Sequence, residues 1–277
     1  MSKKLRFSIL SMGRIENDLS WNLAIPHSGD MYNKNPQAEW ISFPVFSVLV
    51  DHPDIGYVLF DTGHAPGDEK DRMPEANRHL FPIYCEREDF IDARLESLGL
   101  TVNDISLIVL SHTHFDHIGG LHFFQNTKAG KNVLVSRADY AKGLVESHKS
   151  TSVPCFAYNR ADFEFEGIDF YFCDEDTELA PGLELITLEG HVPTILGLVV
   201  HLESGTYIFP SDAMPLQANY GPPPLPPTLP GQIYDSLGFH RSVEKVKKLQ
   251  KKYNATIIFP HDYILFPDLK KAPEYYE

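Results

Sequence analysis

Three histidines and one aspartate lie close together near the middle of the chain, in the segment SHTHFDHIGG at residues 111–120. The apolar run ISLIVL precedes this segment and predicts a buried strand that ends just before it. In an extended or turning backbone, residues i and i+2 point the same way, so His112 and His114 can bind one ion. Asp116 and His117 follow where a helix should begin, and from there they can reach a second ion.

Imidazole nitrogens and carboxylate oxygens form a donor set that suits zinc, and also iron, manganese or cobalt. A single histidine is usually an ordinary core or surface residue, but this cluster at the end of a core strand favours a metal site. Three more candidate ligands each follow another predicted strand: His191, Asp212 and His261. Each of these could be structural if it stood alone. Together with the cluster they predict a shared site at one edge of a sheet scaffold.

The pattern His-X-His-X-Asp-His in this segment resembles the signature of the metallo-β-lactamase superfamily. The resemblance implies an α/β fold, a four-layer αβ/βα sandwich, with two divalent ions at one edge between the sheets. It implies one domain over residues 1–277, with two similar halves at roughly 1–165 and 166–277. The implied ligands are His112, His114 and His191 for one ion and Asp116, His117 and His261 for the other, with Asp212 bridging the two.

The segment Asp61-Thr62-Gly63 follows another predicted strand, residues 57–60. In the superfamily such an aspartate lies beneath the metal site. The resemblance therefore implies that Asp61 orients a ligand histidine through the free ring N–H of that histidine. His64, beside it, could line the pocket, and as a lone histidine it is expected not to be a metal ligand.

Within the superfamily, the chain is similar to N-acyl-homoserine lactonases and related lactonases. The similar segments are residues 43–46, 60–63, 111–120, 211–213 and 261–262. The resemblance implies quorum quenching by opening of a small-molecule lactone, or hydrolysis of a related ester. A hydroxide that bridges the two ions would attack the carbonyl, and Asp116 would pass the proton to the leaving alkoxide.

The segment after Asp212 departs from the lactonase pattern. Those enzymes often carry a tyrosine three residues after the bridging aspartate, where it contacts the substrate carbonyl, and this chain has Pro215 there. Proline cannot donate a hydrogen bond. We expect Tyr220, just before a proline-rich loop, to supply the missing catalytic contact, with Tyr263 as the alternative.

Other reactions on the same metal site stay open. A glyoxalase-II-type thioesterase or a phosphodiesterase is the main alternative. A di-iron oxygen or nitric oxide reductase is disfavoured because the motif histidines are all present and no flavin domain is apparent. A binding module without catalysis is disfavoured because every ligand type is present.

The composition limits the kinds of partner that this protein is expected to bind. The 277 residues carry a formal net charge of −14, whereas nucleic-acid binding needs a basic footprint, so no nucleic acid is expected. No apolar run is long enough to span a membrane, and no secretory signal is apparent. The three cysteines, Cys85, Cys155 and Cys173, are far apart in the sequence. We expect them to be free thiols in a reducing compartment. These features predict a cytoplasmic protein, whereas its oligomeric state stays open, with a dimer as one alternative.

Two long irregular segments are expected near the site. Residues 14–40 show no periodicity but contain Trp21, Tyr32 and Trp40, which favours either a flap over a pocket or a surface loop held by aromatic side chains. The proline-rich loop 222–230 should be stiff and is expected near the site, although it could also be a ligand for another domain. A helix is predicted over residues 234–253.

Overall fold

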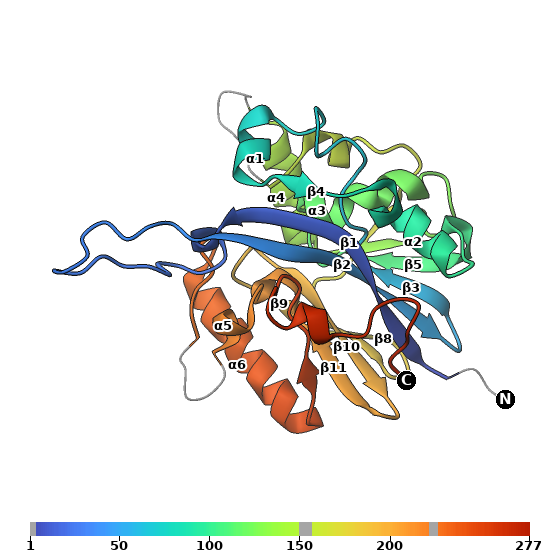
Figure 1. The fold of residues 1–277 in the computed structure, drawn as a ribbon. Coiled ribbons are helices and arrows are strands. Elements are labelled where there is room, and N and C mark those ends of the chain that lie inside the picture. The colour runs from blue at the N-terminus through green and yellow to red at the C-terminus, as the bar shows by residue number, and fades with distance from the viewer. Residues whose placement is uncertain (1–3, 150–156, 222–226) are drawn as a thin grey trace.

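The computed structural model describes residues 4–149, 157–221 and 227–277. Within these ranges the strands form two sheets (Figure 1). The seven-stranded sheet has the order β4-β1-β2-β3-β5-β6-β7. Its strands are β1 (Arg6–Asp18), β2 (Trp40–His52), β3 (Gly56–Phe60), β4 (Ile83–Tyr84), β5 (Ile105–Val109), β6 (Val133–Val135) and β7 (Phe170–Phe172).

The five-stranded sheet has the order β12-β11-β10-β9-β8. Its strands are β8 (Thr177–Ala180), β9 (Leu183–Leu188), β10 (Ile195–Leu202), β11 (Gly205–Phe209) and β12 (Thr256–Ile257). The helices are α1 (Glu75–Leu80), α2 (Ile91–Ser97), α3 (Phe115–Ile118), α4 (Arg137–Ser147), α5 (Gln217–Tyr220) and α6 (Ser236–Tyr253). None of the helices in the described ranges is long and apolar enough to cross a membrane.

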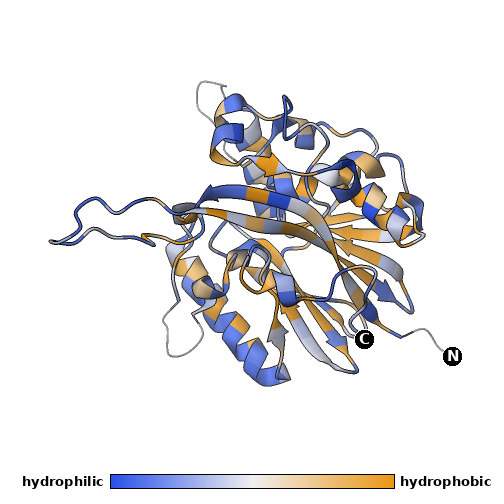
Figure 2. Ribbon diagram, in the orientation of Figure 1, coloured by the Kyte–Doolittle hydropathy of each residue, from blue (hydrophilic) through white to orange (hydrophobic). Residues whose placement is uncertain are grey.

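The two sheets pack face to face, with helices on their outer faces, and this confirms the predicted four-layer sandwich. The layer between the sheets joins Phe7 and Val48 of the first sheet to Leu198 and Phe209 of the second. A separate core lies between the second sheet and α6. Figure 2 shows that apolar residues concentrate in the strands, whereas α6 turns a polar side outward. This separation follows from the sequence, because α6 has an apolar stripe at helical spacing and lysines on its other face.

The first sheet extends past the middle of the chain. β7 pairs in parallel with β6, so this sheet reaches Phe172. The predicted helix over 234–253 begins at Ser236, where the Asp235 carboxylate accepts a hydrogen bond from the backbone N–H of Leu237. Residues 222–226 of the proline-rich loop lie outside the described residues, and so does Cys155.

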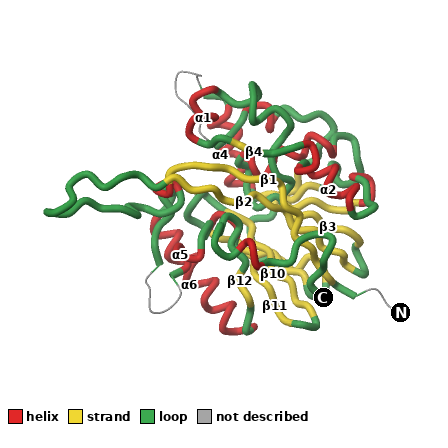
Figure 3. Tube along the Cα trace, in the orientation of Figure 1, coloured by secondary structure: helices red, strands yellow, loops and turns green. Residues whose placement is uncertain are grey.

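The segment 14–40 forms the tip of a long hairpin. β1 continues to Asp18 and β2 begins at Trp40, so only the two ends of the segment are strand residues. Residues 22–39 form a loop that projects from the body of the molecule (Figure 3). Only its base, through Trp21 and Asn22, reaches the pocket described below. Met31 and Tyr32, farther along the loop, are exposed.

Candidate metal centre

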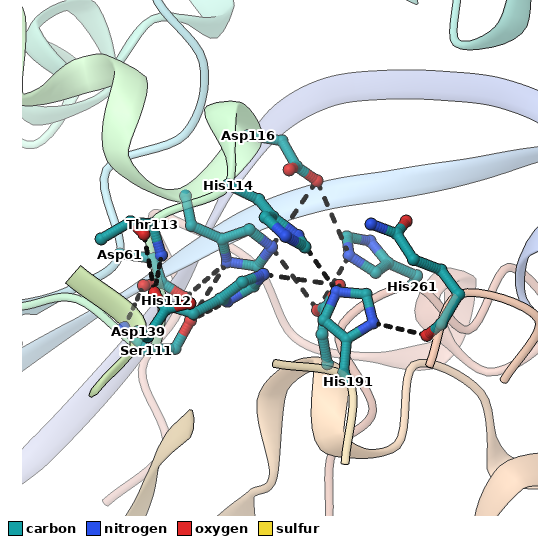
Figure 4. A network of polar contacts seen from close by, with 12 residues as sticks. Asp61, Ser111, His112, Thr113, His114, Asp116, Asp139, His191 and His261 are labelled. Carbon is teal, nitrogen blue, oxygen red and sulfur yellow. Dashed lines mark hydrogen bonds and ion pairs between the residues drawn. The ribbon is translucent and has the colours of Figure 1, made fainter. Parts of the chain in front are cut away.

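The structure brings all seven predicted ligands to one edge of the sandwich, between the two sheets (Figure 4). His112 and His114 follow β5, and α3 carries Asp116 and His117. The other three follow strands of the second sheet or its edge: His191 after β9, Asp212 after β11 and His261 after β12. All seven residues are buried, with Asp116 the most exposed at 8%.

The ligand atoms fall into three overlapping groups in which all atoms lie within 4.8 Å of one another. One group contains His112, His114 and His191, and a second contains Asp116, His117 and His261. These two groups have the composition that the resemblance implied for the two ions. The third group, His112, His117 and Asp212, overlaps both of them.

The carboxylate of Asp212 lies between the first two groups. Its Oδ2 is 3.6 Å from His191 Nε2 and 4.0 Å from His112 Nε2. Its Oδ1 is 3.1 Å from His261 Nε2 and 3.5 Å from His117 Nε2. Each oxygen of the carboxylate therefore faces a different group of histidines.

Three ligand histidines are held from behind through their Nδ1 atoms. His117 Nδ1 is 2.9 Å from Asp61 Oδ2, and the other oxygen of Asp61 accepts a hydrogen bond from the backbone N–H of Ser111. His261 Nδ1 donates to the carbonyl oxygen of Pro44, and His191 Nδ1 donates to that of Gln232. These contacts leave Nε2 free to face the centre in all three rings.

The backbone around the cluster is also closely fitted. Thr62 donates from its N–H and from its Oγ1 to the carbonyl oxygen of His117. A Cβ atom at Gly120 would lie 2.0 Å from the carbonyl oxygen of Thr62, so this contact requires glycine. This close approach of the backbone at Gly120 fixes the ligand-bearing turn against the end of β3.

A second anchor holds the backbone between the first two ligands. The Asp139 carboxylate, on α4, accepts hydrogen bonds from the N–H and Oγ1 of Thr113, each at 2.7 Å, and from the hydroxyl of Tyr158 (Figure 4). Burial raises the pKa of Asp139 to about 6. Sequence reasoning did not single out Asp139, because a carboxylate on a helix more than twenty residues from the motif carries no local signal.

The electrostatics of the cluster divide the histidines into two kinds. Burial lowers the pKa of His112 and His114 well below the ordinary value, and it lowers that of His191, so these rings are neutral and able to ligate. Burial opposes ionisation of His117 as well, but nearby carboxylates, with Asp116 first, raise its pKa to about 10. The pKa of His261 is raised in the same way, with Asp212 as the main cause. Without an ion, the carboxylate side of the cluster therefore holds protons.

These residues fit divalent metal ions. Nε2 of His112 and of His117 is buried and has no hydrogen-bond partner among the described residues. His114 Nδ1 lies 3.0 Å from His191 Nε2, and without an ion it donates a hydrogen bond to that nitrogen, because His191 Nδ1 already donates to Gln232. Buried nitrogens that converge without partners are costly unless an ion binds them. His64 is also buried without a partner, but it belongs to none of the three ligand groups and packs against Phe90.

A family model of the metallo-beta-lactamase superfamily matches residues 41–261, which include every ligand. The chain belongs to this superfamily. It is 30% identical to N-acyl homoserine lactonase AiiB of Agrobacterium fabrum, over 97% of this chain and 98% of that protein. It is 28% identical to N-acyl homoserine lactonase AiiA of Bacillus thuringiensis subsp. kurstaki, over 85% and 88% of the two chains.

Solved structures of superfamily members share the fold. A structure of an N-acyl homoserine lactone hydrolase with bound N-hexanoyl-L-homoserine has a TM-score of 0.80, with 23% identity and full coverage of both chains. The dizinc quorum-quenching lactonase AidC has a TM-score of 0.64, with 19% identity over 99% of this chain and 94% of that chain. At these identities the likeness shows the metallo-β-lactamase fold itself.

A pocket opens onto the cluster of candidate ligands. Its volume, including the open mouth, is about 490 Å³. Five ligands line it, together with apolar side chains and three amides. The ligands are His114, Asp116, His191, Asp212 and His261, and the other lining residues are Ile15, Asn17, Trp21, Asn22, Phe43, Phe81, Phe115, Ala157, Pro215 and Gln232. The amides of Asn17, Asn22 and Gln232 were not found from the sequence, since no motif marks them.

The structure does not bring Tyr220 to this pocket. Its hydroxyl donates to the side-chain carbonyl oxygen of Gln250 on α6, and its ring packs against Phe259 in the core beneath α6. From the sequence, Tyr220 is expected to contact the substrate because it lies close to Asp212 along the chain. In the structure, the short helix α5 turns Tyr220 toward α6. Tyr263, the alternative, packs against the core of the first sheet and is not among the lining residues either. Pro215 does line the pocket, as its place after Asp212 suggested.

Proposed function

We propose that this protein is a hydrolase with two metal ions, most favourably zinc, that opens N-acyl homoserine lactones. The observation that carries the proposal is the Asp212 carboxylate, which directs one oxygen to each of two ligand groups. Seven ligands are too many for one four-coordinate ion, and one carboxylate between two groups suits a pair. Nitrogen and oxygen ligands favour zinc, and iron, manganese or cobalt would also fit.

The substrate class is inferred from the curated relatives, which are N-acyl homoserine lactonases across nearly the full chain. The pocket supports a neutral, partly apolar substrate, because one wall is built from Ile15, Trp21, Phe43 and Phe81. The net charge of −14 is unfavourable for polyanionic substrates. Opening of such a lactone would make the protein quorum-quenching.

Two bound ions would supply a water of lowered pKa and would polarise the ester carbonyl. The chain supplies the geometry around them. Asp116 lines the pocket, and its Oδ2 lies 3.6 Å from His117 Nε2 and 3.8 Å from His261 Nε2. In the proposed reaction the water oxygen bonds to the carbonyl carbon, the ring C–O bond breaks, and Asp116 moves the proton from the water to the leaving alkoxide.

The test is a substrate panel on zinc-reconstituted protein whose metal content has been measured. N-hexanoyl homoserine lactone, a glutathione thioester and a phosphodiester are compared by kcat/KM, with acid release followed for the lactone. We expect two equivalents of zinc and the highest kcat/KM on the lactone. A phosphodiester or thioester that turns over far faster than every lactone would replace the proposed substrate class. One equivalent or less of zinc would contradict the dinuclear site.

A further inference from the structure

Asn17 is a buried amide in the apolar wall of the pocket. It lies at the end of β1 and is 2% exposed. Ile15 and Trp21, on either side of it along the chain, line the same pocket, and Phe81 packs edge-on against Trp21. A polar side chain in such a wall is unfavourable unless its donors and acceptor are satisfied.

Within the described part of the chain, only the acceptor of this amide has a hydrogen-bond partner. Asn17 Oδ1 accepts a hydrogen bond from Asn22 Nδ2 at 3.0 Å. No partner for Asn17 Nδ2 occurs among residues 4–149, 157–221 and 227–277. Asn17 Nδ2 is not sealed in the core either. The residue lines the pocket, and this atom is not fully enclosed. Its N–H donors are therefore available to a molecule in the pocket.

Asn22 fixes the direction in which Asn17 presents these donors. The backbone N–H of Asn22 donates to the carbonyl oxygen of Leu19, and its own carbonyl accepts from Asn219 Nδ2, both at 2.9 Å. Asn219 is fully buried, and its Oδ1 accepts from the N–H of Leu216. A row of three asparagines thus connects α5 to the pocket and ends in one free amide donor.

We propose that Asn17 Nδ2 donates a hydrogen bond to the acyl amide carbonyl oxygen of the bound lactone. This inference rests on the proposed function. The reacting ester carbonyl must lie at the ligand cluster, whereas Asn17 stands in the apolar wall that suits the acyl chain. Pockets of this kind use a few placed polar groups to fix the orientation of an otherwise apolar ligand. Asn17 is therefore assigned a role in selecting lactones that carry an amide beside the ring.

The test uses the metal-loaded enzyme and two lactones of matched chain length. N-hexanoyl homoserine lactone carries the amide, and a γ-alkyl lactone lacks it. Replacement of Asn17→Leu should lower kcat/KM for the amide lactone about 10-fold more than for the alkyl lactone, mainly through KM. Asn17→Ser serves as a second variant if the leucine variant does not fold. Asn22→Leu should produce a smaller selective loss, because it removes only the group that orients the donor.

Equal losses on both lactones would overturn the proposal, because a structural defect or a contact with the reacting carbonyl affects both. The same holds if Gln232→Leu, and not Asn17→Leu, produces the selective loss, since Gln232 is another amide in the pocket. Binding of N-hexanoyl homoserine, followed by the fluorescence of Trp21, separates this proposal from the proposed function. If no lactone turns over, the proposed function fails, whereas binding that weakens about 10-fold in Asn17→Leu still supports the amide contact. If the wild type does not bind N-hexanoyl homoserine, or if Asn17→Leu binds it as tightly as the wild type, the proposed amide contact is wrong.

Discussion

The two walls of the pocket are built in different ways. In the ligand wall, three of the histidines that face the centre are held from behind through Nδ1: His117 by Asp61, His191 by the carbonyl of Gln232 and His261 by the carbonyl of Pro44. The apolar wall includes Ile15, Trp21 and Phe81, and its buried amide, Asn17, is held through Oδ1, which accepts from Asn22. This difference suggests that the ligand wall determines the reaction, whereas the apolar wall determines which substrate is presented to it.

Removal of the shared carboxylate should have the largest effect. We expect Asp212→Ala to lose metal and to lower kcat/KM at least about 10³-fold, because bound ions supply several kcal/mol of transition-state stabilisation. Elemental analysis and lactone kinetics measure both effects. The control is Asp54→Ala, an exposed aspartate in the turn between β2 and β3, which should leave both unchanged. Full metal occupancy in Asp212→Ala would remove this residue from the ligands.

The anchor at Asp139 should give the ligand wall a pH-dependent stability. Its pKa is raised from 3.8 to about 6 in the folded protein, so the folded state binds this proton more tightly than the unfolded chain. This contribution is fully present below pH 4 and is lost as the pH rises through 6. It amounts to about 3 kcal/mol.

Denaturant unfolding of metal-free wild type and Asp139→Asn measures this contribution. The unfolding free energy of the wild type, relative to the variant, should fall by about 2 kcal/mol between pH 4 and pH 7. A difference that stays constant, or one that grows with pH, would show that Asp139 is not the titrating group.

The support behind His117 should matter less than a ligand itself. Asp61→Asn keeps the shape of the side chain but removes the charge that orients the ring, and we expect metal affinity to fall about 10–100-fold. Competition with a chelator measures the affinity. The matched control is Asp262→Asn, a buried aspartate whose carboxylate accepts only backbone N–H groups near α5 and after His261. If Asp262→Asn weakens metal binding as much as Asp61→Asn, the effect reflects general loosening of the site.

The smallest effect on catalysis is expected at Tyr220. Loss of its hydroxyl in Tyr220→Phe removes a hydrogen bond to Gln250, which should lower the unfolding free energy by about 1 kcal/mol. The value of kcat should stay within about twofold of wild type, because α5 turns the ring away from the pocket. A fall in kcat of about 10²-fold with metals still bound would instead restore the oxyanion role that the sequence suggested.

The ligand wall could be predicted from the sequence because its ligands follow apolar strands, with Asp116 and His117 on the short helix α3 after β5. In the second sheet, β9, β11 and β12 run in the same direction, because β10 is antiparallel to β9 and to β11 and β12 is parallel to β11. Residues that follow these strands, such as His191 and His261, therefore meet at one edge whatever their distance along the chain. The apolar wall could not be predicted in this way. Asn17 lies within a strand, and its partner Asn22 gains significance only through a hydrogen bond that no spacing rule indicates. Tyr220 was misplaced for the same reason, since the direction of a side chain on a short helix depends on tertiary packing.

The distribution of ligands between the sheets also affects how the chain folds. Four ligands belong to the first sheet and three to the second sheet or its edge, and His261 follows His112 by 149 residues. An ion that binds only when the two sheets have docked acts as a cross-link formed late in folding, after the long loops have lost their freedom. Since it binds the native state alone, it shifts the unfolding equilibrium by mass action. In the proposed enzyme, the residues that prepare the reaction would thus also link the two sheets of the sandwich.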